Sequence, residues 1–217
     1  MLRIDLLPLL CYNTLKVGDL MPQKSFKILF VGNSYTFYND MPETLFAEEA
    51  LTSGYEFEIT SVTKGGYRLC QFADPENEHG KRLRETVNGV HYDFAVIQEQ
   101  SFNAITNEPQ FLEGVKNVIS LISADRFILY ATWGRNDQSE KLNELGLTRE
   151  EMTEKISVAY NKAAKLYSAT VAEVGKAFLE YSLLNNKDEL YNKDNSHPSE
   201  IGSRIAAKEI LKTIINS

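Results

Sequence analysis

The chain has 217 residues, of which 43% are hydrophobic and 24% are charged, and its formal net charge is −7. This length suits one globular domain with a sizeable core. The excess of acidic residues argues against nucleic acid or an anionic membrane as a main partner, because both attract clustered Lys and Arg. Two distant cysteines and three scattered histidines argue against a disulfide framework or a Cys/His metal centre.

The beginning of the chain weakly resembles an export signal, but Asp5 and Pro8 interrupt its leucine-rich stretch and small residues for a cleavage site are lacking. The sequence therefore favours a cytoplasmic protein over an exported one. We expect an N-terminal extension over residues 1–24 and a single domain over residues 25–217. No apolar run approaches the roughly 20 residues that cross a bilayer.

Short apolar runs alternate with helical patterns along the chain. The expected strands cover residues 27–31, 56–62, 94–98, 127–131 and 170–174. The expected helices cover residues 42–52, 81–87, 111–122, 150–169 and 198–215. This alternation predicts βαβ units, and hence one α/β domain with a mainly parallel five-stranded sheet that is covered on both faces.

Parallel sheets bind ligands at the carboxyl ends of their strands. This rule places four polar loops on one rim of the predicted sheet, at residues 32–40, 64–67, 98–103 and 132–137. A candidate site is therefore expected at this rim.

Ser34 follows the first predicted strand in a turn of small residues. In that position its hydroxyl is a candidate nucleophile and its backbone N–H a candidate oxyanion donor. A turn or capping serine is the alternative interpretation.

His197 lies three residues after Asp194, just before the last predicted helix. A histidine suits a general base at neutral pH, and a carboxylate so near can orient its ring. The alternative is an Asp turn that caps the helix beside an exposed histidine. Ser34, His197 and Asp194 together supply the three roles of a serine hydrolase.

A phosphate or flavin site is the competing function for the turn after the first strand, since such turns can bind phosphate. The turn contains neither G-x-x-x-x-G-K-[ST] nor G-x-G-x-x-G. Because both motifs are missing, the expected fold is the one remaining argument for a flavin-binding protein.

Two segments resemble a known family. The segment from Gly32 to Thr36 (Gly-Asn-Ser-Tyr-Thr) resembles the first sequence block of SGNH (GDSL-type) hydrolases, usually Gly-Asp-Ser-x-Thr. The Asp194-x-x-His197-Pro segment resembles their last block, and the order of the two blocks is that of the family. The group within the family that is most similar has a Gly-Asn-Ser start and lies close to the carbohydrate acetylesterase branch.

The resemblance implies a three-layer α/β/α, flavodoxin-like fold with Ser34 as nucleophile, His197 as base and Asp194 as its orienting acid. It further implies an oxyanion hole formed by the backbone N–H groups of Ser34 and a glycine, together with a side-chain amide. Gly66 is the expected glycine, with Gly65 as the alternative. The third block departs from the family's Gly-x-Asn-Asp, because this chain has Gln98-Glu99-Gln100-Ser101 there. Gln98 is the expected amide donor and Gln100 the alternative.

Aromatic and basic residues near the same rim are candidates for substrate binding. Trp133 and Arg135 follow the fourth predicted strand, and Tyr35 follows Ser34. Such side chains can stack on a sugar ring or bind polar groups. An anchored loop with a solvated arginine is the alternative.

The sequence as a whole predicts a serine esterase that removes a short acyl group, expected to be acetyl, from a carbohydrate or related hydroxylated substrate. It needs no metal or organic cofactor, and its partner is a small-molecule or carbohydrate ester. The alternatives are a lipase or thioesterase with the same triad, or an SGNH-fold binding protein with little activity.

Overall fold

The computed structural model describes residues 24–217. The expected extension over residues 1–24, with the question of export, falls almost wholly outside the described residues and stays a prediction. Five parallel strands form one sheet in the order β2-β1-β3-β4-β5. The strands are β1 Lys24–Gly32, β2 Tyr55–Thr63, β3 His91–Ile97, β4 Ser123–Ala131 and β5 Thr170–Glu173.

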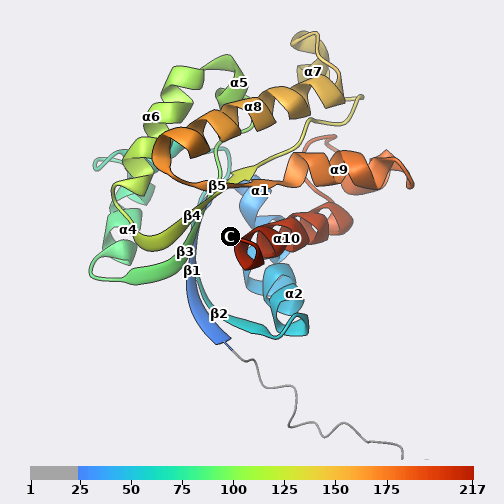
Figure 1. The fold of residues 1–217 in the computed structure, drawn as a ribbon. Coiled ribbons are helices and arrows are strands. Elements are labelled where there is room, and N and C mark those ends of the chain that lie inside the picture. Colours follow the sequence, from blue (N-terminus) through green and yellow to red (C-terminus); the bar gives the residue numbers. More distant parts are fainter. Residues whose placement is uncertain (1–23) are drawn as a thin grey trace, which may run out of the picture.

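Helices connect the strands and cover both faces of the sheet (Figure 1). One face carries α3 Leu69–Ala73, α4 Glu78–Val87, α5 Asn103–Thr106, α6 Glu108–Ile119 and α8 Arg149–Tyr167. The other face carries α1 Ser34–Phe37, the π-helical turn η3 Met41–Phe46, α2 Ala47–Thr52, α9 Val174–Ser182 and α10 Glu200–Ile215. Shorter segments are η2 Tyr38–Asp40, α7 Glu140–Glu144 and η4 Lys187–Leu190. The fold is thus the three-layer α/β/α arrangement that the sequence predicts.

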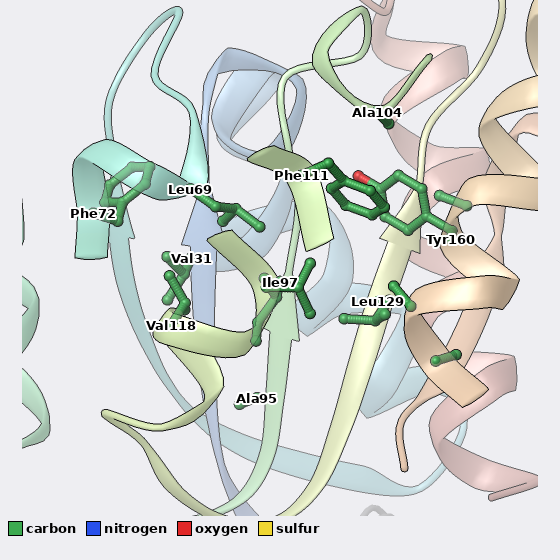
Figure 2. Packing of buried hydrophobic residues seen from close by; sticks show 14 of the residues in the cluster. Val31, Leu69, Phe72, Ala95, Ile97, Ala104, Phe111, Val118, Leu129 and Tyr160 are labelled. Carbon is green, nitrogen blue, oxygen red and sulfur yellow. The ribbon is translucent and has the colours of Figure 1, made fainter. Parts of the chain in front are cut away.

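Alternating side chains of β1 explain why the molecule has two cores. Leu29 and Val31 point into the core beneath α6 and α8, whereas Ile28 and Phe30 point into the core beneath α10, and all four are fully buried. A strand buried on both faces is apolar at successive positions, and this is the pattern that identified it in the sequence. Figure 2 shows the first core, where Phe111 and Tyr160 lie against each other above Ile97 and Leu129.

The predicted strands and long helices are confirmed, with ends that differ by a few residues. Residue 174 was expected at the end of the last strand, but it begins α9. Helix α9 and the short helices α1, α3, α5 and α7 lie outside the expected helices. Among residues 24–217, no helix combines the length and the apolar content that crossing a membrane requires.

The topology places the carboxyl end of β1 at the point where the strand order reverses. The chain runs from β1 to β2 on one side and continues to β3 on the other side of β1. This reversal of strand order opens a crevice at the ends of the strands, where ligands bind in open α/β sheets. Ser34 follows β1 at this point.

Candidate functional site

Ser34 is the first residue of α1, directly after the turn that leaves β1. The side chain of Asn33 caps this short helix by accepting a hydrogen bond from the Tyr35 N–H at 3.1 Å. The Ser34 hydroxyl is half-buried. Its backbone N–H donates to no acceptor within residues 24–217, so that donor is free for a ligand.

The side chain of Gln98 fixes the turn between β1 and α1 through two hydrogen bonds. Its amide oxygen accepts hydrogen bonds from the Asn33 N–H at 2.8 Å and from the Thr36 hydroxyl at 2.9 Å. A side chain on Gly32 would lie 2.7 Å from the same oxygen, so glycine is required there for the close packing. The buried glutamine thus fixes the serine turn on the end of β3.

The side chain of Gln98, the expected oxyanion donor, packs against the serine turn. Its side chain is fully buried, and its amide nitrogen donates to the carbonyl oxygen of Glu99. The amide oxygen and one of the two amide N–H donors are therefore paired inside the protein. The alternative, Gln100, is half-buried, and its oxygen accepts from the Asn103 N–H at 2.9 Å. Its amide nitrogen has no acceptor within the described range.

The turn after β2 lies beside Ser34. Asn33 donates a side-chain hydrogen bond to the Tyr67 carbonyl at 3.0 Å, and the Lys64 N–H donates to the Gly32 carbonyl at 3.1 Å. Gly66 has a φ of +74°, a value that favours glycine. In residues 24–217 the Gly66 N–H has no acceptor, so a second free backbone donor lies in a turn fixed to the serine turn.

The last loop brings His197 and Asp194 to Ser34, 163 positions away in the sequence. The Ser34 hydroxyl and His197 Nε2 are 2.8 Å apart, and Nδ1 of the same ring is hydrogen-bonded to the Asp194 carboxylate. The other Asp194 oxygen accepts from the backbone N–H groups of Ser196 at 3.0 Å and of His197 at 2.9 Å. The three side chains form one continuous chain of hydrogen bonds.

The pKa of Asp194 reflects these contacts. Partial burial alone would raise the pKa, but the hydrogen bonds from His197 and Ser196 outweigh it and hold the pKa below its usual value. Asp194 is therefore ionised at neutral pH, as an acceptor for the imidazole N–H must be.

Trp133 and Tyr35 hold this loop in place instead of facing a substrate. Trp133 is fully buried, stacks between Tyr35 at 4.7 Å and Phe178 at 4.3 Å, and donates its indole N–H to the Ser196 carbonyl at 3.1 Å. The Tyr35 ring is 6% exposed, and its hydroxyl lies 2.6 Å from that of Ser196. The expected stacking of Trp133 on a sugar ring does not fit this burial.

Tyr38, which is not among the residues predicted from the sequence, is a neighbour of His197. Its half-buried ring lies parallel to the His197 imidazole, with centroids 4.5 Å apart. Tyr38 follows Ser34 by four residues, at the end of the short helix α1. An aromatic residue one helical turn after the serine was the signal that could have indicated it.

Arg135 lies on the rim as expected, at the carboxyl end of β4. Its guanidinium group lies 4.4 Å from the centroid of the Phe102 ring. A cavity of about 260 Å³ is bordered by Arg135 and by Asp194 of the last loop. The other residues that border this cavity are Gln138, Ser139, Glu140, Lys141 and Asn195. All of these lining residues are of polar or charged types.

Glu99 is a buried acid that the sequence did not single out. Its side chain is fully buried, and its carboxylate accepts from the backbone N–H of Gln100 at 2.6 Å, from that of Leu69 at 3.2 Å, and from the Asn103 amide at 3.2 Å. Glu99 thereby joins the loop after β2 to the loop after β3. Burial raises its pKa to about 7, although these three hydrogen bonds act in the opposite direction.

The raised pKa of Glu99 predicts a loss of stability as the pH rises. A carboxyl group that binds its proton more tightly in the folded state contributes most stability below its unfolded pKa of 4.5 and loses it as the pH rises to about 7. The loss corresponds to about 3 kcal/mol. We expect Glu99→Gln to abolish this part of the pH dependence, because Gln stays neutral and the Asn103 amide can rotate to pair with it.

Urea denaturation at pH values from 4.5 to 8 measures this difference. Glu113→Gln is the matched control, since Glu113 is an exposed glutamate of α6. Equal slopes of unfolding free energy against pH in the wild type and in Glu99→Gln would contradict the prediction.

Within the described residues, no cluster of three or more His, Cys, Asp or Glu side chains has the geometry of a metal site. A serine hydroxyl next to an imidazole that is held by a carboxylate can lose its proton to the imidazole and attack an acyl carbon.

Comparison with known proteins identifies the family. No protein-family model and no curated protein matches the chain. A solved structure from Slackia heliotrinireducens, described as "a putative SGNH hydrolase", is 30% identical, with a TM-score of 0.75 over 88% of this chain and 99% of that chain.

Two further solved structures share the fold at lower identity. A DUF4886 family protein from Bacteroides uniformis is 17% identical, with a TM-score of 0.74 over 89% of this chain and 84% of its own. Axe2, an acetylxylan esterase from Geobacillus stearothermophilus, is 16% identical, with a TM-score of 0.62 over 89% of this chain and 96% of its own. The likeness to the Slackia protein extends over nearly the whole of both chains, and this chain therefore belongs to the SGNH hydrolase family.

Proposed function

We propose that this protein is a serine esterase that removes an acetyl or similarly short acyl group from a carbohydrate or related hydroxylated substrate. The observation that carries the proposal is the hydrogen-bonded chain from Ser34 through His197 to Asp194. Axe2, which has a similar fold, acts on acetylxylan, and its solved structures include catalytic mutants in which a serine or a histidine is replaced by alanine.

In the proposed reaction the Ser34 hydroxyl attacks the ester carbonyl while His197 Nε2 takes its proton. Asp194 accepts the hydrogen bond from Nδ1 and stabilises the imidazolium that forms. When the tetrahedral intermediate collapses, His197 returns the proton to the leaving alcohol and an acyl-Ser34 ester remains. A water molecule, activated by the same histidine, then releases the carboxylic acid and restores the serine.

The negative charge on the tetrahedral intermediate needs hydrogen-bond donors. The backbone N–H groups of Ser34 and Gly66 are free within the described part of the chain, which supports them in this role. For the third donor we propose Gln100 in place of Gln98. The Asn103 N–H holds the Gln100 oxygen toward α5, which leaves the amide nitrogen available.

The cavity beside Asp194 favours a hydroxylated leaving group over a long acyl chain. Every side chain that borders it is polar, and an acyl channel requires apolar walls. This lining supports the carbohydrate esterase over the lipase and the thioesterase. The polar lining does not favour the alternative of an SGNH-fold binding protein with little activity.

A comparison of esters with different acyl chains tests the proposed substrate class. We expect turnover of p-nitrophenyl acetate and of acetylated xylooligosaccharides, and a kcat/KM for p-nitrophenyl octanoate at least tenfold lower than for the acetate. A protein that prefers the octanoate would be a lipase. If none of these esters is hydrolysed, the hydrolase proposal is overturned in favour of a binding protein.

A further inference from the structure

Arg135 is a partly buried cation without a counter-ion in the described structure. The side chain is half-buried, and its Nε atom is shielded from solvent without a hydrogen-bond partner. Within residues 24–217 the guanidinium group makes neither a hydrogen bond nor an ion pair, and its one specific contact is the Phe102 ring at 4.4 Å.

A second buried arginine shows how this protein normally satisfies such a group. Arg149 is 6% exposed, and its guanidinium nitrogens donate to Glu150 at 2.9 Å and to Ser182 at 2.9 Å. A buried donor without an acceptor costs free energy, and the cost is larger for a charged group. The missing partner of Arg135 therefore points to an acceptor that arrives with a ligand.

The position of Arg135 connects that ligand with the proposed reaction. Arg135 borders the cavity of about 260 Å³ to which Asp194 also contributes. Its charge also acts on the phenol of Tyr35, the residue next to Ser34. A group bound to Arg135 would therefore lie beside Asp194 of the proposed triad.

Two cations, Arg135 and Lys141, and two acids, Asp194 and Glu140, border the cavity. Lys141 is exposed to solvent, whereas the shielded Nε of Arg135 has no hydrogen-bond partner within residues 24–217. The Asp194 carboxylate is occupied by His197 and by two backbone N–H groups. Glu140 is the remaining acid of the lining, and it is exposed to solvent.

We propose that Arg135 binds a carboxylate on the alcohol part of the substrate, so that the natural ester belongs to an acidic sugar or another carboxylated alcohol. The planar guanidinium group matches a carboxylate with two parallel hydrogen bonds, and its stacking on Phe102 fixes its plane. This inference rests on the proposed function, whose site it shares.

Hydrolysis of monoacetylated glucuronic acid and of monoacetylated glucose tests the proposal, because the two esters differ in the carboxylate. We expect the wild type to prefer the glucuronic acid ester. Arg135→Gln should lower kcat/KM for this ester by about 10- to 100-fold more than for the glucose ester, which corresponds to a hydrogen bond to a charged group. Arg82→Gln, which changes an exposed arginine of α4, should leave both values unchanged. Equal losses on the two esters in Arg135→Gln, or a wild-type preference for the glucose ester, would overturn the proposal.

A binding measurement separates this proposal from the proposed function. Isothermal titration of Ser34→Ala with glucuronate and with glucose needs no turnover. We expect glucuronate to bind more tightly than glucose, and we expect this difference to be lost in the Ser34→Ala/Arg135→Gln double variant. Absence of the difference in Ser34→Ala would refute the carboxylate site, whereas glucuronate binding without Ser34-dependent hydrolysis of any ester would refute only the esterase.

Discussion

Ser34→Ala should lower kcat for acetyl ester hydrolysis by about 10⁴- to 10⁶-fold, because the proposed nucleophile is lost. The stability of the variant should stay close to that of the wild type. The Ser34 hydroxyl is half-buried and its side-chain partner is His197, whose ring still has access to water when the hydroxyl is removed. Initial rates with p-nitrophenyl acetate, together with a thermal melt, measure both quantities.

A matched control for this variant is Ser120→Ala. Ser120 is exposed at the end of α6, and its hydroxyl bonds only the Asn117 carbonyl, at 2.7 Å. Because its hydroxyl has no other partner within residues 24–217, we expect this control to retain full activity. A Ser34→Ala protein that is folded and retains more than a few per cent of the wild-type rate would contradict Ser34 as the nucleophile.

Trp133→Ala should destabilise the protein by about 3 to 5 kcal/mol, in the range for large aromatic residues removed from a core. The indole ring is fully buried between Tyr35 and Phe178, and the cavity left behind would border the loop that carries His197. For a chain of this length the melting temperature should fall by roughly 10 °C. Circular dichroism is the suitable probe, since Trp133 is the sole tryptophan and its fluorescence disappears in the variant.

Trp133→Phe separates packing from hydrogen bonding at the same position. It keeps an aromatic ring in the stack but removes the indole N–H that donates to the Ser196 carbonyl at 3.1 Å. We expect a smaller loss, of about 1 to 3 kcal/mol, from the unsatisfied carbonyl and the smaller ring. A Trp133→Ala protein within 1 kcal/mol of the wild type would show that Trp133 does not hold the loop.

The fold could be predicted because the inner strands β1, β3 and β4 contain continuous apolar runs, whereas the edge strand β2 is more polar. Strands buried on both faces stand out from the amphipathic helices between them, and β1 is the clearest case. Helix α9 was not predicted because it begins directly after β5 and contains Gly175 in its first turn. That glycine is needed for packing, since a side chain there would lie 2.4 Å from the Thr132 carbonyl. The local sequence around Gly175 does not reveal this contact, because Thr132 lies far away in the chain.

The candidate site could be predicted only in part. Ser34, Asp194 and His197 lie in short motifs, so local sequence indicated them, and the parallel topology indicated the rim. The orientation of the Gln98 amide depends on Asn33 and on Thr36, which lie more than 60 positions away, and no local pattern reveals it. The burial of Trp133 depends in the same way on residues from distant parts of the chain.

The most direct test of the esterase proposal is covalent labelling with a fluorophosphonate probe, followed by mass spectrometry of the intact protein and of its peptides. We expect one adduct per chain, located on Ser34, and no adduct in Ser34→Ala or in protein unfolded before labelling. An adduct on another residue, or folded wild-type protein that stays unlabelled, would contradict an activated Ser34 and with it the proposed esterase.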